Sequence, residues 1–370
     1  MESQPPSAIY SDASASPGGY FGRGEKACFE SAWPRRCQFL PSILIFCQAV
    51  HVGGKALFFS RISAIATQLP SEEIPNSYFG SYLDTSDQWI AQRTGIQSRF
   101  WLKKNESVLD ITVPVLAQLI EKSGRPDSVI VATCSADKVL PSLAHRVASA
   151  CEIDGLHFDV NAACSGFLVA LAQARALIGA GMVSRVAVIG ADAMSKLIDH
   201  NDRATAVLFG DGAGGLMLER AQQDVFLSTC FDSKVAFCDI LMDQGRIHEG
   251  VKPVIQMQGQ EVYRLAVGAL SRSVLQSLHL ANKAIEDVDF VFAHQANDRI
   301  LQSVAKNLGI DDQIFYKTVN CYGNTSAASI PLGLAHAHEN NRLKNQDILV
   351  LTAIGAGMAW GSMVLKWEEI

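Results

Sequence analysis

The sequence predicts an α/β fold made of two similar halves, packed in alternating layers of helix, sheet, helix, sheet and helix. Hydrophobic residues make up 48% of the 370 positions and charged residues only 18%, a balance that favours a large layered core. From about residue 60, β-branched runs alternate with helical patterns. The third and strongest sign is an internal repeat, in which four segments recur in the same order.

The repeat pairs one strand–turn–helix or strand–turn–strand unit of each half with its partner. The paired segments are 128–135 with 289–297, 157–178 with 316–337, 184–193 with 346–357, and 212–220 with 358–367. Similarity of four segments in register indicates two copies of one α/β unit. We therefore predict an N-terminal half over residues 60–222 and a C-terminal half over residues 223–370.

Residues 1–59 differ from the rest of the chain. They are rich in Ser, Pro, Gly and Ala and show little periodicity before residue 39, which favours a disordered extension or a translated upstream region. The alternative is a transit peptide, but acidic residues at four positions argue against it. The apolar run 39–50 follows two arginines as in a signal peptide, yet it lies late in the chain and no A-x-A cleavage site follows.

Charge and cysteine usage exclude several classes of protein. The net charge of −6 gives no support for a nucleic-acid partner. No apolar stretch approaches 18 residues, so no membrane-spanning helix is expected. Nine cysteines occur without any CxxC pair, so neither a zinc site nor a redox pair is predicted. We expect a reducing compartment, the cytoplasm, and no metal or cofactor.

Cys164 is the candidate nucleophile. The segment FDVNAACSGF predicts a strand that ends near Asn161 and a helix that begins near Ser165. That helix is apolar almost all round, which is typical of a buried helix. Its amino end would direct partial positive charge at Cys164 and favour the thiolate. We interpret the other eight cysteines as small core residues: Cys28, Cys37, Cys47, Cys134, Cys151, Cys230, Cys238 and Cys321.

Two polar residues of the second half stand at the matching turns. His294 follows an apolar strand in FVFAHQAND, and Asn324 lies in VNCYGNTSAAS, the repeat partner of the Cys164 elbow. A histidine alone at a strand end is more often a satisfied core residue. A histidine and an asparagine placed pseudo-symmetrically to an elbow cysteine instead predict one shared site.

From Arg61 to Lys366 the chain resembles β-ketoacyl-acyl-carrier-protein synthase III, an initiating condensing enzyme of the thiolase-fold superfamily. The motifs are DTSDQWIAQRTGI, AACSGF, GDGAGG, HQAN, GNTSAAS and a terminal GxGxxWG. The resemblance implies a thiolase-like fold, a homodimer, and a catalytic triad of Cys164, His294 and Asn324.

The resemblance also implies the reaction. An acyltransferase of this kind condenses an acyl-CoA, expected to be acetyl-CoA, with malonyl-acyl carrier protein and releases CO₂, which begins type II fatty acid synthesis. Cys164 would carry the acyl group. His294 and Asn324 would donate hydrogen bonds to the malonyl thioester oxygen, and the backbone amides of Cys164 and Ala356 would form the oxyanion hole.

Further positions follow from the same resemblance. Trp89, Arg93, Arg203 and Asn297 would bind CoA, because an aromatic ring can stack on adenine and arginines can pair with phosphates. Arg264, Arg299 and Lys306 are spaced to form a basic patch for the acidic carrier protein; the alternative is an ordinary solvated face. GDGAGG, residues 210–215, precedes a strand rather than a helix, so we interpret it as a hairpin turn and not as a phosphate loop.

Several positions depart from the common form of the family. Leu140 stands where an aromatic residue often limits the acyl pocket, Ile354 where phenylalanine is common, Gln260 where asparagine is frequent, and Ala356 is the middle of a usual GGG turn. These changes leave the starter acyl group open. The alternatives are a condensing enzyme of secondary metabolism, one with a longer or branched starter, and a non-catalytic partner subunit.

Overall fold

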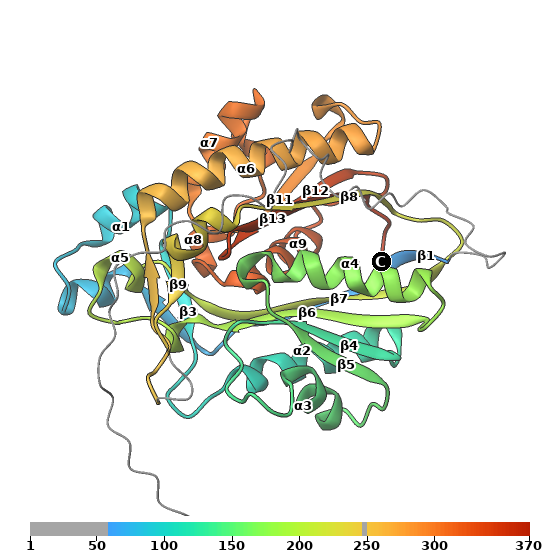
Figure 1. The fold of residues 1–370 in the computed structure, drawn as a ribbon, viewed down its shortest axis with the longest axis horizontal. Helices are drawn as coiled ribbons and strands as arrows, with labels where there is room; N and C mark the ends of the chain where they lie inside the picture. Colours follow the sequence, from blue (N-terminus) through green and yellow to red (C-terminus); the bar gives the residue numbers. More distant parts are fainter. Residues whose placement is uncertain (1–57, 246–249) are drawn as a thin grey trace, which may run out of the picture. The chain divides into compact units, whose positions relative to one another are not determined.

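The structure, a computed structural model, describes residues 58–245 and 250–370 (Figure 1). The extension predicted over residues 1–59 lies almost wholly outside the described residues, as do Cys28, Cys37 and Cys47. In the two described ranges no helix is long and apolar enough to cross a membrane.

Two sheets form the body of the described chain, one from each part of the sequence. The first has the strand order β1-β7-β6-β4-β5 and the second the order β11-β12-β13-β8. The strands of the first sheet are β1 (Phe59–Gln68), β4 (Ser128–Ala132), β5 (Leu156–Val160), β6 (Arg185–Ala193) and β7 (Asp211–Ala221). Those of the second are β8 (Phe226–Ser233), β11 (Phe290–Ala293), β12 (Ile348–Gly355) and β13 (Ala359–Lys366).

The two sheets share one pairing pattern. β1–β7 and β7–β6 are antiparallel and β6–β4 is parallel, just as β8–β13 and β13–β12 are antiparallel and β12–β11 is parallel. A parallel bridge between Val291 and Phe315 stands where the first sheet has the β4–β5 pairing. The repeat seen in the sequence is thus a repeat of strand order and direction.

Helices separate and cover the sheets (Figure 1). α4 (Gly166–Gly179) and α9 (Ser329–Glu339) contact strands of both sheets and form the middle layer. α2 (Val108–Ser123) and α3 (Leu143–Ala150) cover the first sheet, and α6 (Gly259–Leu280) covers the second with α7 (Asp298–Leu308) packed on it. The five layers confirm the predicted fold class.

Smaller elements line one end of this body. They are the two-stranded ribbons β2 (Glu72–Pro75) with β3 (Ser98–Trp101) and β9 (Leu241–Asp243) with β10 (Ile255–Met257), and the short helices α1 (Asp87–Thr94), α5 (Arg203–Ala206) and α8 (Val319–Tyr322). The 3₁₀ turns are η1 (Asn76–Ser81), η2 (Ala163–Ser165), η3 (Met194–Lys196), η4 (Val235–Ile240), η6 (Ile285–Asp287), η7 (Asp312–Ile314) and η8 (Ser326–Ala328).

α4 is buried between the sheets, as its apolar sequence predicts. Phe167, Leu168 and Leu171 have no exposed surface. Arg175 is a charged residue in this layer, and it pairs with Asp224 at 2.7 Å and stacks on the Phe226 ring at 4.4 Å. A charge inside an apolar layer is tolerated only when it is paired in this way.

The interpretation of GDGAGG as a hairpin turn is wrong. Three of its four glycines, Gly212, Gly214 and Gly215, lie inside β7, which is hydrogen-bonded between β1 and β6. A Cβ atom on Gly214 would stand 3.1 Å from the backbone nitrogen of Leu332 and 3.2 Å from Pro331. Glycine is needed here because α9 packs directly against the strand.

Candidate active site

Two matching elbows meet at the centre of the molecule. In the first, β5 leads through η2 into α4; in the second, α8 leads through η8 into α9. Ala163 and Ser326 begin the two 3₁₀ turns, and both have positive φ, 47° and 51°. Their backbone amides donate to the side-chain oxygens of Asn161 (3.2 Å) and Asn324 (3.0 Å). In this match Asn161 corresponds to Asn324, and Cys164 to Ala327.

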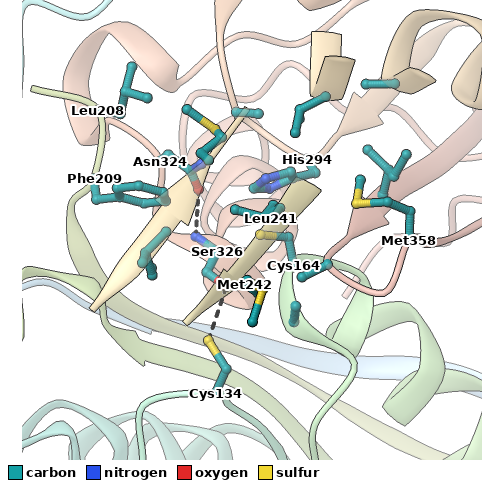
Figure 2. A pocket seen from close by; sticks show the side chains of 18 of the residues that line it. Cys134, Cys164, Leu208, Phe209, Leu241, Met242, His294, Asn324, Ser326 and Met358 are labelled. Carbon is teal, nitrogen blue, oxygen red and sulfur yellow. Dashed lines mark hydrogen bonds between the residues drawn. The ribbon is translucent and has the colours of Figure 1, made fainter. Parts of the chain in front are cut away.

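The structure brings Cys164, His294 and Asn324 together at one cavity of about 470 Å³ (Figure 2). Cys164 lies on η2, His294 directly follows β11, and Asn324 directly precedes η8. His294 is 3% exposed and Asn324 6% exposed. Three residues that lie up to 160 positions apart in the sequence therefore share one wall, as the repeat predicted.

Asn324 is held so that its amide group faces the cavity. Its backbone nitrogen donates to Leu208 at 2.9 Å, and its carbonyl accepts from Gly210 at 3.0 Å. Its side-chain oxygen is taken by the Ser326 amide. The NH₂ group is then the free end of the side chain, which suits the predicted donor role.

His294 is neutral over the working pH range. Burial lowers the pKa of its ring to about 4. Its Nδ1 atom lies 2.8 Å from Ser329 Oγ on the first residue of α9, which leaves Nε2 as the ring nitrogen available to a ligand. A neutral ring can donate or accept at Nε2, depending on where its single proton lies.

The Cys164 thiol is protonated in the unliganded site. Burial raises its pKa to about 12, and the negative charge of Asp192 adds to the rise, whereas a hydrogen bond with Ser326 and the backbone amide at Cys164 lower it. The expectation that the amino end of α4 would favour thiolate is therefore wrong for the free enzyme, because desolvation outweighs it.

The raised pKa predicts slow alkylation of Cys164 by iodoacetamide at pH 7. Below a pKa of about 12 the thiolate fraction, and so the rate, should rise about tenfold per pH unit. The measurement is the mass of the proteolytic peptide that contains Cys164, followed over time, because the chain has eight other cysteines, of which Cys238 is exposed. A rate that levels off near pH 8 would contradict a protonated resting thiol.

The turn after β12 touches the cysteine elbow. A Cβ atom on Gly355 would lie 3.0 Å from the backbone nitrogen of Cys164 and 2.6 Å from the Ala162 carbonyl oxygen. Only glycine allows this approach. It places Ala356, which lines the cavity, next to Cys164, where the predicted oxyanion hole requires a second amide.

A cluster of one aromatic and two basic residues joins α1 to α5. Ser86 caps this helix by accepting from the Trp89 amide at 3.1 Å, and Gly95 ends it with a φ of 79°. The guanidinium carbons of Arg203 and Arg93 lie 4.9 and 5.9 Å from the Trp89 ring. Three of the predicted CoA-binding residues are therefore neighbours.

Asn297, the fourth predicted CoA-binding residue, lines the cavity but is already engaged. Its side-chain oxygen accepts from the Arg299 amide at 2.9 Å and so caps α7. Its NH₂ group donates to the Arg93 carbonyl at 3.2 Å. The side chain thus joins α1 to the cavity wall, a structural contact that sequence reasoning did not foresee.

Comparison with known proteins identifies the family. The model described as "3-Oxoacyl-[acyl-carrier-protein (ACP)] synthase III" matches residues 158–234, and its C-terminal counterpart matches residues 278–367. A "Beta-ketoacyl-[acyl-carrier-protein] synthase III" of Roseobacter denitrificans is 40% identical over 318 residues, which cover 83% of this chain and 98% of the relative. The chain belongs to the 3-oxoacyl-[acyl-carrier-protein] synthase III family.

Solved structures agree with membership of the synthase III family. The β-ketoacyl-[acyl carrier protein] synthase III of Thermus thermophilus has 35% identity and a TM-score of 0.79, covering 84% of this chain and 99% of that one. The priming β-ketosynthase of the R1128 polyketide pathway has 26% identity and a TM-score of 0.81, covering 85% and 97%. The predicted fold and enzyme class, a condensing acyltransferase, are confirmed.

Asp192 is a site residue that the sequence analysis missed. It is the penultimate residue of β6 and is fully buried. One carboxylate oxygen accepts from Thr133 Oγ1 (3.0 Å), the Cys134 amide (2.8 Å) and Ser135 Oγ (2.8 Å), and the other accepts from the Ala327 amide (3.2 Å). The carboxylate thus ties η8 to the first sheet. An aspartate in the apolar strand VAVIGADA was the signal that could have revealed it.

Asp192→Asn removes the negative charge near Cys164 while keeping the size of the side chain, so it should affect both the stability of the protein and the pKa of Cys164. The NH₂ group would face donors on one side, so the free energy of unfolding should fall by about 1–3 kcal/mol. Removal of the negative charge should lower the pKa of Cys164, whose rise it supports, and speed alkylation at a given pH. Thiol alkylation and urea unfolding measure both effects.

Asp159→Asn is the matched control for that experiment. Asp159 also accepts from two backbone amides, those of Leu143 and Ala144 at 2.7 Å, but unlike Asp192 it is not among the groups that shift the pKa of Cys164. It should lose stability without a change in Cys164 alkylation. If Asp192→Asn also left the rate of Cys164 alkylation unchanged, Asp192 would not contribute to the raised pKa of Cys164.

The remaining predicted residues are only partly brought together. Ile354 is 6% exposed and lines the cavity. Leu140 is 82% exposed and lies outside the cavity of a single chain, so the predicted acyl-pocket role would need a second subunit. Arg264 lies on α6 and pairs with Glu261 at 2.9 Å. Arg299 and Lys306 are exposed on α7, about two turns apart.

The interpretation of the cysteines as core residues needs correction. Cys230 is buried, but Cys134 and Cys238 line the cavity, and Cys238 is exposed. Cys134 Sγ lies 3.9 Å from both Met194 Sδ and Ser326 Oγ. The sequence repeat could have indicated Cys134, because it follows the strand that corresponds to the one before His294.

Proposed function

We propose that this synthase condenses an acyl-CoA with malonyl-acyl carrier protein to give a 3-oxoacyl-acyl carrier protein, CO₂ and free CoA, the first condensation of type II fatty acid synthesis. The convergence of Cys164, His294 and Asn324 on one cavity carries the proposal. The cytoplasm as compartment, and a reaction without cofactor or metal, remain predictions from the sequence.

In the first stage Cys164 attacks the thioester carbon of acyl-CoA. The thiol proton ends on the CoA sulfur, which leaves as CoA thiol. The backbone amides of Cys164 and Ala356 stabilise the tetrahedral oxyanion. The thiol of the free enzyme has a pKa of about 12 and is therefore unreactive at neutral pH. Acyl-CoA binding must promote its deprotonation.

In the second stage malonyl-acyl carrier protein loses CO₂. The enolate oxygen that forms is stabilised by donors from Asn324 Nδ2 and His294 Nε2. The enolate carbon attacks the acyl group on Cys164, and the thiolate is expelled and takes up one proton. Trp89, Arg93 and Arg203 bind the CoA of the first stage, and Arg264, Arg299 and Lys306 contact the acidic carrier protein.

The test is the intact mass of the protein after mixing with acyl-CoAs of two to ten carbons. An acetyl adduct on Cys164, followed by its transfer on adding malonyl-acyl carrier protein, supports the initiating synthase. No adduct with any acyl-CoA would support the non-catalytic alternative and sink the proposal.

A longer or branched starter is the second candidate. The cavity wall contains Met194, Met242, Met257 and Met358, and methionine side chains adapt to differently shaped partners. Preferential adduct formation with a branched or medium-chain acyl-CoA would favour this candidate over acetyl-CoA.

A homodimer is our further prediction for the synthase. β5 is an edge strand of its sheet, and the apolar side chains of Val139, Leu140 and Leu156 are 72%, 82% and 43% exposed. Exposed apolar side chains beside an open edge favour association. Light scattering should give twice the mass of the chain, and Leu140→Lys should shift it toward the monomer.

Met182→Lys is the control, since Met182 is 66% exposed but lies beyond α4 rather than near β5. It should leave the dimer intact. A monomeric wild-type protein at micromolar concentration would refute the prediction.

A further inference from the structure

The Ser329 hydroxyl lies between two possible hydrogen-bond acceptors, His294 Nδ1 and the Ser326 carbonyl oxygen. Ser329 Oγ lies 2.8 Å from Nδ1 and 2.9 Å from the Ser326 carbonyl oxygen. Both His294 and Ser329 are 3% exposed. The hydroxyl has one hydrogen and the carbonyl can only accept, so Ser329 can donate to the carbonyl or to the ring nitrogen, but not to both.

The choice of acceptor fixes the tautomer of His294. If Ser329 donates to the Ser326 carbonyl, Nδ1 must carry the ring proton and Nε2 presents a lone pair to the cavity. If Ser329 donates to Nδ1, the ring proton lies on Nε2 and points into the cavity. Only the second arrangement can donate to an enolate oxygen, which the malonyl stage requires.

We propose that Ser329 is a positioning residue whose hydroxyl donates to His294 Nδ1 and so makes the Nε2–H tautomer available for malonyl decarboxylation. Among the described residues, Ser329 is the one whose side chain lies within hydrogen-bond distance of this nitrogen, and its hydroxyl can donate to it or accept from it. Ser329 Oγ lies within hydrogen-bond distance of both Nδ1 and the Ser326 carbonyl oxygen. Without the hydroxyl, that carbonyl, with which the ring is hydrogen-bonded, is the acceptor that remains on the Nδ1 side, so we expect the ring proton there and the lone pair at Nε2. Exchange with water interconverts the two tautomers without net proton transfer.

The neutral state of His294 makes this choice matter. An imidazolium would carry protons on both nitrogens, and Ser329 would then be irrelevant. Because burial holds the pKa of His294 near 4, the ring has a single proton at neutral pH. The proposal rests on the proposed function for its catalytic consequence, but the tautomer itself is a property of the free protein.

The first readout is ¹⁵N NMR of histidine-labelled free protein. Wild type should populate both tautomers, because the Ser329 hydroxyl can either donate to Nδ1 or accept from it, whereas Ser329→Ala should show the Nδ1–H form alone. Identical His294 nitrogen shifts in the two proteins would overturn the proposal. This readout needs no substrate, so it stands even if the proposed reaction is wrong.

The second readout separates the two half-reactions. Ser329→Ala should acylate from acetyl-CoA within about twofold of wild type, while CO₂ release from malonyl-acyl carrier protein falls roughly 10- to 100-fold, less than the 10²–10³ expected for loss of a whole donor. Ser329→Thr, which keeps the hydroxyl, should restore CO₂ release. Equal losses in both half-reactions would indicate a structural role and contradict the proposal.

Two further variants guard against misfolding. Ser329→Cys is close to the size of serine but is a weak donor, so it should behave as Ser329→Ala does. Ser277→Ala on α6 removes another buried hydroxyl, one that donates to the Val274 carbonyl at 2.9 Å. It should leave both half-reactions unchanged; a selective loss of CO₂ release in this variant would count against the assignment to Ser329.

Discussion

Cys164→Ser is expected to abolish acyl transfer. A serine hydroxyl in the same place would be a far weaker nucleophile, because an alcohol gives up its proton far less readily than a thiol does. By comparison with the loss of a covalent nucleophile elsewhere, the rate should fall roughly 10⁴-fold or more. The measurement is the acyl adduct in the intact mass after mixing with the preferred acyl-CoA.

Cys238→Ser is the matched variant. Cys238 is an exposed thiol that lines the same cavity, so it tests whether a different cysteine takes the acyl group. It should acylate as wild type does. An adduct that persists in Cys164→Ser and disappears in Cys238→Ser would show that Cys238, on η4, is the nucleophile instead.

The fold could be predicted because its evidence is local and repeated. The apolar run from Phe167 to Leu177 indicates a buried helix without knowledge of its partners. The four paired segments become two sheets with the same order of antiparallel and parallel pairings. Cys164, His294 and Asn324 could be placed together because a repeat carries its turns to equivalent positions in space.

The predictions that were wrong concern residues whose properties depend on contacts between distant segments of the chain. Burial raises the pKa of Cys164 and the Asp192 charge adds to the rise, and together they outweigh the lowering by Ser326 and by the backbone amide at the start of the helix, so the helix end alone could not predict the net direction. The GDGAGG segment contains the glycines of a turn, but the approach of α9 requires them inside β7. Ser329 looked like part of a motif, and only its two distances show that it serves His294.

The roles predicted for Leu140 and for the basic residues depend on surface neighbours, which is a second reason why the sequence was not sufficient. A single chain leaves Leu140 exposed, so its role depends on a partner subunit that the sequence does not specify. Arg264 counted as a free positive charge in the sequence, but Glu261 one helical turn away pairs with it. The role of a surface residue depends on the residues that lie next to it in space, and the sequence alone does not identify them.

His294→Ala and Asn324→Ala are expected to retain acylation and to lose malonyl decarboxylation. Neither side chain is the nucleophile, and the oxyanion of the first stage is held by backbone amides. Each variant removes one donor from the enolate oxygen, which should cost roughly 10²–10³ in the rate of CO₂ release. Asn324 has the clearer geometry, because its oxygen is fixed by Ser326 at 3.0 Å and its NH₂ group is free.

Rapid mixing with acyl-CoA followed by intact mass measures the first stage, and CO₂ release from labelled malonyl-acyl carrier protein measures the second. Asn161→Ala is the control, since Asn161 makes the same contact in the other elbow, to Ala163 at 3.2 Å, without a proposed role at the enolate. Loss of acylation in His294→Ala would instead make His294 the base that takes the Cys164 proton, which the lone-pair tautomer at Nε2 would allow. In that case the first stage would need the tautomer with a lone pair at Nε2 and the second the tautomer with a proton there, and the half-reaction that fails in His294→Ala decides which role the ring has.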